Sequence, residues 1–231
     1  MYRNFFVSVI IPALNEERSI ALTINDLPAE LDEIVVCDNG STDNTVEIAQ
    51  SAGAKVVTER ERGYGAACLK AIDSVDSRCD ILLFIDADYS DYPKEAPQLL
   101  DPIVDNRADI VIGSRTTALE SRKALTPVAR FGNLLATSLM RRLWDVAYTD
   151  LGPFRAIRYE SYRQLQMRDR NFGWTVEMQI RAAKRRLRPC EIPVSYRERI
   201  GTSKISGTIS GSIKAGTKIL YLITREALND I

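Results

Sequence analysis

Two carboxylates stand two positions apart directly after an apolar run. Asp86 and Asp88 follow the segment 81–85. In an extended chain, residues at i and i+2 point to the same side, so both carboxylates can face one ligand. Oxygen ligands of this kind suit Mg²⁺ or Mn²⁺, which proteins commonly hold with one or two carboxylates and the phosphates of a substrate. The spacing predicts a divalent-metal and diphosphate site at Asp86 and Asp88.

A further carboxylate, Asp38, ends the earlier apolar run 33–37 and opens the turn Asp38-Asn39-Gly40-Ser41. A carboxylate here can accept a hydrogen bond from a nucleobase N–H, and Gly40 allows close approach of the backbone. A capped turn without a ligand explains the same residues equally well. The segment 11–17 after the first apolar run lacks the G-x-G-x-x-G pattern, which argues against a dinucleotide dehydrogenase.

Strands and helices alternate in the first half of the chain. Short, β-branched and nearly continuous apolar runs are typical of buried parallel strands, and they occupy 6–12, 33–38, 55–57, 81–86 and 109–113. Helical patterns lie between them at 16–27, 43–52, 64–77 and 94–105. The alternation predicts a doubly wound α/β sheet, in which ligands bind at the carboxyl ends of the strands. The polar residues at or just past such ends are Asn15, Asp38, Asp86, Asp88 and Arg115.

The second half is more helical. Helices are expected at 127–145, 176–187 and 208–229, and a strand at 189–196. The Gly/Ser/Thr-rich stretch 201–217 is expected to form a flexible loop that leads into the last helix. Neither a linker nor an internal repeat is visible, so we expect one domain over residues 1–231.

The charge is divided unevenly along the chain. Net charge is zero, but residues 1–113 carry 9 Lys and Arg against 21 Asp and Glu, a net of −12, and residues 114–231 carry a net of +12. A basic half indicates an anionic partner, such as nucleic acid, an anionic bilayer or a phosphorylated lipid. No nucleic-acid module is recognisable, so a nucleic-acid partner is not expected.

Histidine is absent and the four cysteines lack zinc-ligand spacing. Catalysis must therefore use carboxylates, a metal, or an acceptor that needs no deprotonation. The sequence shows neither an 18-residue apolar run nor a secretory signal, so we expect a cytoplasmic protein that does not span a membrane. Basic and apolar residues are mixed in 127–145 and in the last helix, which fits either a position on an anionic membrane face or packing over the sheet.

Seven ordered segments carry a family resemblance. They are 11–16, 38–43, 63–67, 86–88, 111–115, 150–155 and 199–204. With these segments the chain resembles family 2 glycosyltransferases of the GT-A fold, and within them the dolichyl-phosphate mannose synthase and polyprenyl-phosphate glycosyltransferase group. The resemblance implies a mostly parallel GT-A sheet flanked by helices, with a nucleotide-sugar-binding half at 1–113 and a helical acceptor-binding half at 114–231.

The resemblance also implies roles for individual residues. The donor, GDP-mannose or UDP-glucose, would be held by Pro12, Ala13, Asn15, Glu16, Asp38, Gly40, Ser41, Gly65, Asp86, Ala87 and Asp88. The acceptor phosphate would be held by Arg115, Arg130, Arg199, Ser203 and Lys204. Mg²⁺ or Mn²⁺ would bind at Asp88, Asp86 and Ser90. Ser90 stands where some members place a glutamine metal ligand, and Asn39 replaces the second Asp of the usual D-D-G-S, which leaves the donor base open.

A phosphate acceptor agrees with the residues themselves. A phosphate monoester is already largely dianionic near neutral pH, with a second pKa of about 6, so it needs no general base. Taken with the resemblance, this implies inverting transfer of a hexose to a polyprenyl phosphate, with Asp86, Asp88, Arg115 and Glu177 as catalytic residues.

Several alternatives stay open. For a hydroxyl acceptor, Glu177 or Asp150 would serve as the base. A non-catalytic nucleotide-sugar-binding subunit, with or without a membrane-spanning partner, is the other alternative. A sugar nucleotidyltransferase is disfavoured because no G-x-G-T-R loop follows the first strand.

Overall fold

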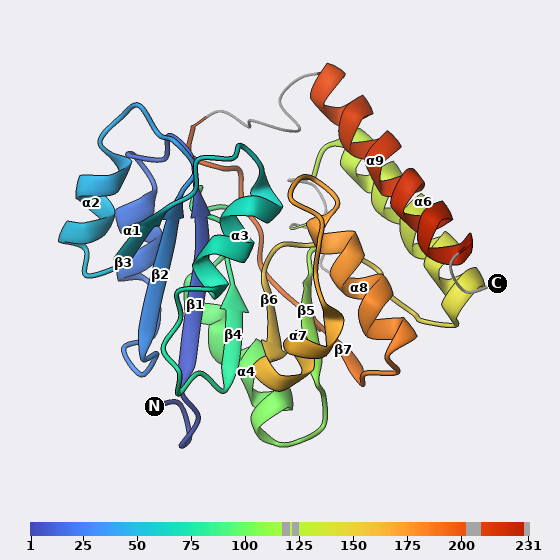
Figure 1. Cartoon of the computed structure of the whole chain (residues 1–231), viewed down its shortest axis with the longest axis horizontal. Helices are drawn as coiled ribbons and strands as arrows, with labels where there is room; N and C mark the ends of the chain where they lie inside the picture. Colours follow the sequence, from blue (N-terminus) through green and yellow to red (C-terminus); the bar gives the residue numbers. More distant parts are fainter. Residues whose placement is uncertain (117–120, 122–124, 202–208, 229–231) are drawn as a thin grey trace.

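A seven-stranded sheet, in the order β3-β2-β1-β4-β6-β5-β7, forms the centre of the molecule (Figure 1). The computed structural model describes residues 1–116, 121, 125–201 and 209–228, except for the side chains of 209–215. The strands are β1 (Val7–Ala13), β2 (Glu33–Asp38), β3 (Lys55–Thr58), β4 (Ile81–Phe84), β5 (Ile110–Ser114), β6 (Arg155–Arg158) and β7 (Pro189–Pro193). All neighbours pair in parallel except β6, which is antiparallel to both β4 and β5. The expected mostly parallel α/β sheet is confirmed.

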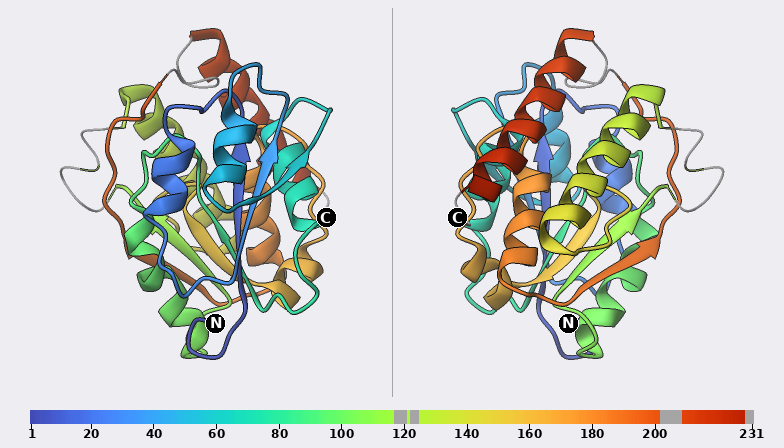
Figure 2. Two further views of the ribbon diagram at one scale, coloured as in Figure 1. Left: turned by 90° about the vertical axis from the view of Figure 1, so that its left-hand side faces the viewer. Right: turned by 90° about the vertical axis from the view of Figure 1, so that its right-hand side faces the viewer.

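Helices cover both faces of this sheet (Figure 2). They are α1 (Ile20–Asn25), α2 (Thr45–Ser51), α3 (Tyr64–Ile72), α4 (Ala96–Val104), α6 (Pro127–Trp144), α7 (Tyr159–Leu165), α8 (Trp174–Lys184) and α9 (Ile209–Leu228), with a 3₁₀ turn at Pro93–Glu95. Successive strand residues point to opposite faces, so Ile10 packs with α3, α6, α7 and α8, whereas Val9 and Ile11 pack with α1, α2 and α4. Two apolar cores therefore hold the sheet from either side.

The strand register brings distant turns to one edge of the sheet. Ala13 at the end of β1 is opposite Asp38 at the end of β2, and Ile10 is opposite Phe84 of β4. Because these strands are parallel, the segments that follow them emerge on the same side. The turns after β1, β2 and β4 therefore meet at the carboxyl edge.

The structure corrects the sequence expectations in the second half. Strand β6 and helix α7 are not predicted, because the four residues of β6 begin and end with arginine and lack an apolar pattern. Arg155 is nevertheless only 1% exposed, and its guanidinium donates to the carbonyls of Leu151, Gly152 and Thr175. The expected flexible loop 201–217 is wrong for residues 209–217, which are the first turns of α9.

The last helix packs beside α6 and α8 (Figure 1). Leu222 and Ile223 of α9 are buried, whereas Phe131 and Leu134 of α6 are 67% and 65% exposed. The apolar residues of the two helices thus divide between core packing and surface. No helix in the described ranges is both long and apolar enough to cross a bilayer.

Candidate active site

A cleft of about 820 Å³ lies at the carboxyl edge of the sheet. The predicted residues in its lining are Pro12, Ala13, Glu16, Asp86, Ala87, Asp88, Arg115 and Arg199. Asn39, which the sequence marks as a departure from D-D-G-S, also lines the cleft. Lining residues that the sequence does not single out are Arg62, Tyr64, Thr126, Asn171, Phe172, Tyr196, Arg197 and Glu198. The two halves of the chain, acidic and basic, therefore face each other across one cavity.

The two carboxylates of the D-x-D segment have different partners. Tyr64 donates its hydroxyl to Asp86 Oδ1 at 3.0 Å. Asp88 Oδ2 forms an ion pair with Arg199 Nη2 at 2.7 Å. The backbone N–H and the hydroxyl of Ser90 both donate to Asp88 Oδ1, at 2.9 and 2.6 Å. Ser90 therefore fixes the orientation of Asp88 in this structure.

The segment 196–200 runs along the turn that carries Asp88. Arg197 N donates to the carbonyl of Ser90, and Ile200 N donates to the carbonyl of Asp88, both at 3.0 Å. The Arg197 guanidinium lies over the ring of Tyr89, 3.5 Å from its centroid. These contacts place Arg199, between Arg197 and Ile200, directly against the carboxylate of Asp88.

Burial and the charge of Asp88 together raise the pKa of Asp86 to about 6, although Arg199 and the Tyr64 hydrogen bond oppose the shift. A bound cation would offset the cost of ionising Asp86 in this buried position next to Asp88. Asp86 and Asp88 supply oxygen ligands, as Mg²⁺ and Mn²⁺ require. The described residues contain no cluster of three or more His, Cys, Asp or Glu suited to a metal. Asp86 and Asp88 are the residues that would hold such a cation, together with substrate oxygens or water.

We expect Asp86→Asn to stabilise the metal-free protein above about pH 6. Because the folded-state pKa lies above the usual 3.8, the folded protein binds more protons between the two values, and its stability falls as pH rises through this window. Asparagine removes this penalty, which is on the order of 3 kcal/mol. Urea unfolding in EDTA at pH 4 and pH 7.5 should show a variant advantage that grows with pH. An advantage that is the same at both pH values contradicts the assignment.

Asp91 is a further buried carboxyl beside this site, and no sequence motif marks it. Neither of its oxygens has a hydrogen-bond partner among the described residues. Burial raises the pKa of Asp91 well above its usual value, although Arg115 opposes the shift. Burial therefore favours the neutral form of this carboxyl group.

The turn after β2 is held together internally. Gly40 N and Ser41 N donate to the Asp38 carboxylate at 3.1 and 3.0 Å, and Asn15 N donates to the Ser41 hydroxyl at 2.8 Å. Asn15 Oδ1 accepts from Thr42 N at 2.7 Å. The structure thus shows a turn that is capped by its own side chains, and the expected nucleoside contact stays a prediction. The structure places Asn15, Asp38, Gly40 and Ser41 outside the described cleft lining.

Asn39 is the residue of this turn that reaches the cleft. Its Nδ2 donates to the carbonyls of Glu59 and Glu61, and its Oδ1 accepts from Gly63 N at 2.8 Å. The amide needs both donor and acceptor atoms for these contacts, which an aspartate could not supply. The departure from D-D-G-S therefore shapes the 59–63 wall of the cleft.

Gly65 serves close packing in this structure. A Cβ at this position would lie 2.1 Å from the carbonyl oxygen of Asp169, and Ala66 N donates to the carbonyl of Arg170 at 2.9 Å. The segment 169–171 therefore caps the start of α3 and sits tightly against it. The structure places Gly65 outside the described lining, unlike the neighbouring Tyr64.

We expect Gly65→Ala to lower the free energy of unfolding by about 1–3 kcal/mol through overpacking. Gly132→Ala is the matched control, because a Cβ there meets nothing within 4 Å. Alanine in the middle of α6 should raise stability by up to about 1 kcal/mol. Urea unfolding of both variants checks the prediction, and equal effects would contradict the close contact.

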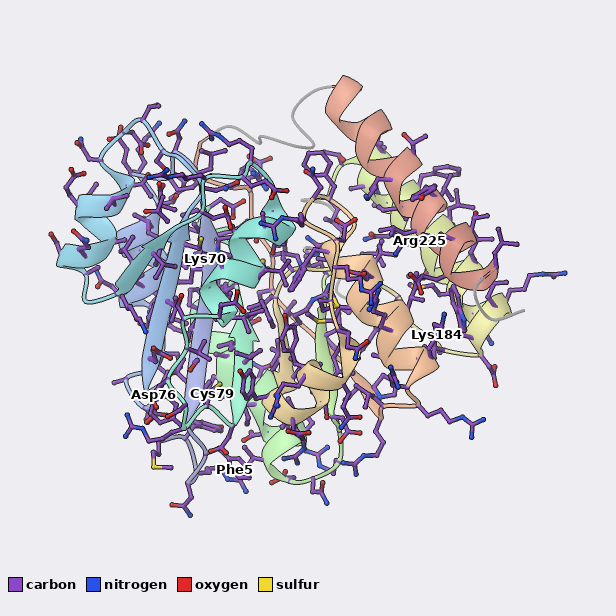
Figure 3. All side chains as sticks on the ribbon, viewed as in Figure 1. Phe5, Lys70, Asp76, Cys79, Lys184 and Arg225 are labelled. Atoms are coloured by element: carbon purple, nitrogen blue, oxygen red, sulfur yellow. The ribbon has the colours of Figure 1, made fainter. Side chains whose placement is uncertain are left out.

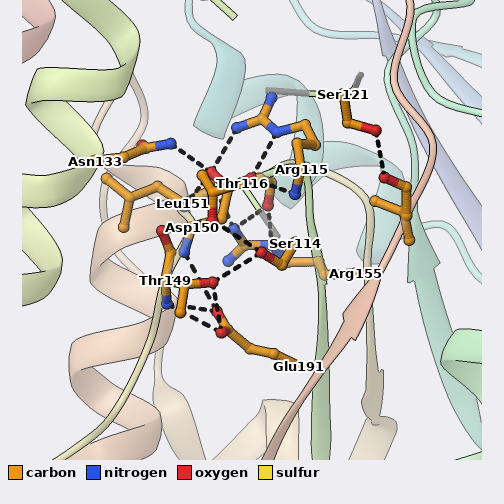
Figure 4. Close-up of polar contacts among 12 residues, drawn as sticks. Ser114, Arg115, Thr116, Ser121, Asn133, Thr149, Asp150, Leu151, Arg155 and Glu191 are labelled. Atoms are coloured by element: carbon orange, nitrogen blue, oxygen red, sulfur yellow. Dashed lines mark hydrogen bonds and ion pairs between the residues drawn. The ribbon is translucent and has the colours of Figure 1, made fainter. Parts of the chain in front are cut away.

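Arg115 forms a buried network with Asp150 (Figure 4). Its Nε and Nη2 donate to the two carboxylate oxygens at 2.8 Å each, and its backbone N donates at 2.9 Å. Asn133 Nδ2 and Leu151 N donate to the same carboxylate. Burial opposes ionisation, but Arg115 holds the pKa of Asp150 below its usual value. Asp150 is therefore the ion-pair partner of Arg115 in this structure, and its expected role as a reserve base stays a prediction.

Glu177 also lies outside the lining of the cleft in which it is expected to act. Its Oε2 accepts from Arg168 N and Asp169 N at 3.0 and 2.7 Å, and its Oε1 pairs with Arg181 at 2.9 Å. The side chain is fully buried and is outside the described cleft lining. In this structure Glu177 supports the 168–173 segment, whose Asn171 and Phe172 line the cleft, and its expected catalytic role stays a prediction.

The remaining acceptor residues are placed unevenly. Arg199 lies in the cleft, as described above. Arg130 is half-buried on α6 and is outside the described lining. Ser203 and Lys204 lie outside the described residues.

A family model and two related sequences all identify this chain as similar to glycosyltransferases. A family model described as "Glycosyl transferase family 2" matches residues 8–166. An uncharacterized glycosyltransferase of Mycobacterium tuberculosis is 36% identical over 210 residues, which cover 90% of this chain and 94% of the relative. A dolichyl-phosphate hexose transferase of Haloferax volcanii is 30% identical over 226 residues, 96% of each chain.

Solved structures share the fold. Glucosyl-3-phosphoglycerate synthase from Mycobacterium tuberculosis, in complex with phosphoglyceric acid, matches with a TM-score of 0.77 and 21% identity over 97% of this chain and 80% of that chain. A structure of the same enzyme with Mn²⁺, UDP-glucose and phosphoglyceric acid matches with a TM-score of 0.75 at 21% identity, over 97% of this chain and 80% of that chain. The expected GT-A architecture is confirmed by this likeness.

Proposed function

The chain belongs to glycosyltransferase family 2, and on this basis we propose that it transfers a hexose from a nucleoside diphosphate sugar to a polyprenyl phosphate, with inversion at the anomeric carbon. The observation that carries the proposal is the ion pair between Asp88 and Arg199 in the cleft. A carboxylate that would hold a cation and diphosphate thus lies next to an arginine that would bind a phosphate oxygen. The function of the Haloferax volcanii relative supports the choice of acceptor.

On the donor side, Asp86 and Asp88 would hold Mg²⁺ or Mn²⁺. When bound, such a cation neutralises the charge that develops on the departing nucleoside diphosphate. Pro12, Ala13 and Asn39 form the neighbouring wall, where the nucleoside would lie. The presence of Mn²⁺ and UDP-glucose in a protein of the same fold supports this arrangement.

On the acceptor side, a phosphate oxygen attacks the anomeric carbon without losing a proton first. The guanidinium of Arg199 suits such an anion, because it donates in a planar fork that matches phosphate oxygens. Arg115 adds positive potential to the same wall, although Asp150 already engages its side chain. Glu198, an exposed carboxylate in the lining, is the residue that would favour a hydroxyl acceptor.

The first half of α6 supports a lipid-borne acceptor. Thr126 and Ala129 line the cleft, whereas Val128, Phe131 and Leu134 of the same helix are more than 60% exposed. An apolar surface therefore begins at the edge of the cleft, where a polyprenyl chain would leave it. We propose that this surface rests on an anionic membrane, with the exposed Arg141 and Arg142 facing lipid head groups.

We expect the double change Phe131→Ser and Leu134→Ser to reduce binding to anionic vesicles at least tenfold, because it removes most of the exposed apolar area of α6. Vesicle flotation measures the binding, and Ser138→Ala on the same helix is the control. Unchanged flotation of the double variant would exclude α6 as the membrane contact.

A transfer assay tests the proposed function. Radiolabelled UDP-glucose or GDP-mannose is incubated with the chain, Mn²⁺ and either a short polyprenyl phosphate or the matching polyprenol. We expect label on the phosphate and none on the alcohol. Label on the polyprenol would show a hydroxyl acceptor, and the absence of label from every pair would favour a non-catalytic subunit.

A further inference from the structure

A second cavity, of about 360 Å³, lies apart from the catalytic cleft, where α8 and α9 meet the end of α7. Its lining contains five cations: Arg168, Arg181, Lys184, Arg185 and Arg225. Lys184 belongs to α8 and Arg225 to α9 (Figure 3). From this composition we propose that the cavity, named here the α8–α9 pocket, binds a phosphoryl anion. The proposal is independent of the proposed function of the cleft.

The charges in this pocket do not cancel. Glu226, also in its lining, pairs with Lys184 at 3.3 Å and with Arg225 at 2.7 Å. Glu177 pairs with Arg181 at 2.9 Å. The ion pairs of the described residues therefore use two carboxylates and three of the five cations. Arg168 and Arg185, both exposed, are left for a ligand.

Arg181 is the fixed part of the pocket. Its Nη1 donates to the carbonyl of Leu165 at 2.7 Å, and its Nη2 contacts Glu177. Its Nε is buried and has no acceptor among the described residues. A buried donor without an acceptor is costly. An anion bound among these cations could accept a hydrogen bond from the Arg181 Nε–H.

The size and the donor types favour a phosphoryl group. A volume of about 360 Å³ lies at the lower end of the range for small-ligand pockets. Guanidinium groups match phosphate oxygens in pairs, and the pocket offers four of them. The anion can come from a soluble phosphate compound or from a lipid head group. Tyr221 and Leu228 of α9 are exposed and could contact a lipid, so a lipid head group can be the source of the anion as well as a soluble compound.

Titration of inorganic pyrophosphate into the full chain, in metal-free buffer, tests the pocket. The variant Arg168→Gln with Arg185→Gln removes two cations that form no ion pair within the described residues, so it should fold. We expect its dissociation constant for pyrophosphate to rise at least tenfold. The control is Arg18→Gln with Lys70→Gln, two exposed cations outside the pocket, and it should bind as the unchanged chain does.

Flotation with vesicles that contain phosphatidic acid separates the two sources of the anion. If a lipid head group is the ligand, the Arg168/Arg185 variant loses flotation together with pyrophosphate binding; if a soluble compound is the ligand, it loses only the latter. The proposal is overturned if the Arg168/Arg185 variant binds pyrophosphate as tightly as the unchanged chain, or if the control variant weakens equally. Sugar transfer by the Arg168/Arg185 variant, measured separately, reports on the cleft alone.

Discussion

Replacing Asp88 with asparagine is expected to lower kcat/KM for sugar transfer about 10³-fold. Asp88 is buried in the cleft and carries the negative charge that faces Arg199. Its loss removes a ligand for the cation and leaves the charge of the departing diphosphate less stabilised, an effect worth several kcal/mol in the transition state. Initial rates of label transfer to polyprenyl phosphate, at saturating Mn²⁺, measure the effect.

The Asp88→Asn variant removes the negative charge of residue 88 and keeps a side-chain oxygen that can accept hydrogen bonds. Its side-chain oxygen can still accept from the Ser90 N–H and hydroxyl, which now donate to Asp88 Oδ1. The fold should therefore persist, as thermal unfolding can verify. Asp73→Asn, an exposed change at the end of α3, serves as the matched control. Transfer by the Asp88 variant at the rate of this control would contradict a catalytic role for Asp88.

Arg115→Met is expected to lower the free energy of unfolding by about 3–5 kcal/mol. The change leaves the Asp150 carboxylate, which is fully buried, without its cation. Adding Asp150→Asn removes the unpaired charge and should recover part of the loss. Urea unfolding of the two single variants and the double variant forms a double-mutant cycle.

The cycle also tests what Arg115 does in the cleft. If its guanidinium acts only through Asp150, the double variant should regain transfer as it regains stability. If its charge also attracts the acceptor phosphate, transfer stays low and the KM for polyprenyl phosphate stays high in the double variant. A single Arg115→Met variant as stable as the unchanged chain would contradict the buried ion pair.

The parts of the fold that depend on local pattern are predictable from the sequence. Asp86 and Asp88 follow a continuous apolar strand, and the carboxyl end of such a strand is where an α/β sheet binds ligands. The structure accordingly places both in the cleft. The amphipathic segment 127–145 likewise becomes α6, with bounds within one residue.

The parts that depend on long-range contacts are not predictable in this way. Arg199 contacts Asp88 because backbone hydrogen bonds join the segment 196–200 to the 88–90 turn. No local sequence pattern predicts that pairing. Glu177 looks like a cleft carboxylate in the sequence, yet the amides of Arg168 and Asp169 turn it inward. Gly65 looks like a ligand-binding glycine, yet the backbone of Asp169 occupies the space beside it.

The central claim is that Asp86 and Asp88 bind a nucleotide sugar through a cation in this cleft. Isothermal titration of UDP-glucose and GDP-mannose, with and without Mn²⁺, tests it most directly. The account predicts that one donor binds at least tenfold more tightly with Mn²⁺, and that Asp88→Asn abolishes this gain. Donor affinity that is unchanged by Mn²⁺, or a gain that survives in the Asp88 variant, would contradict it.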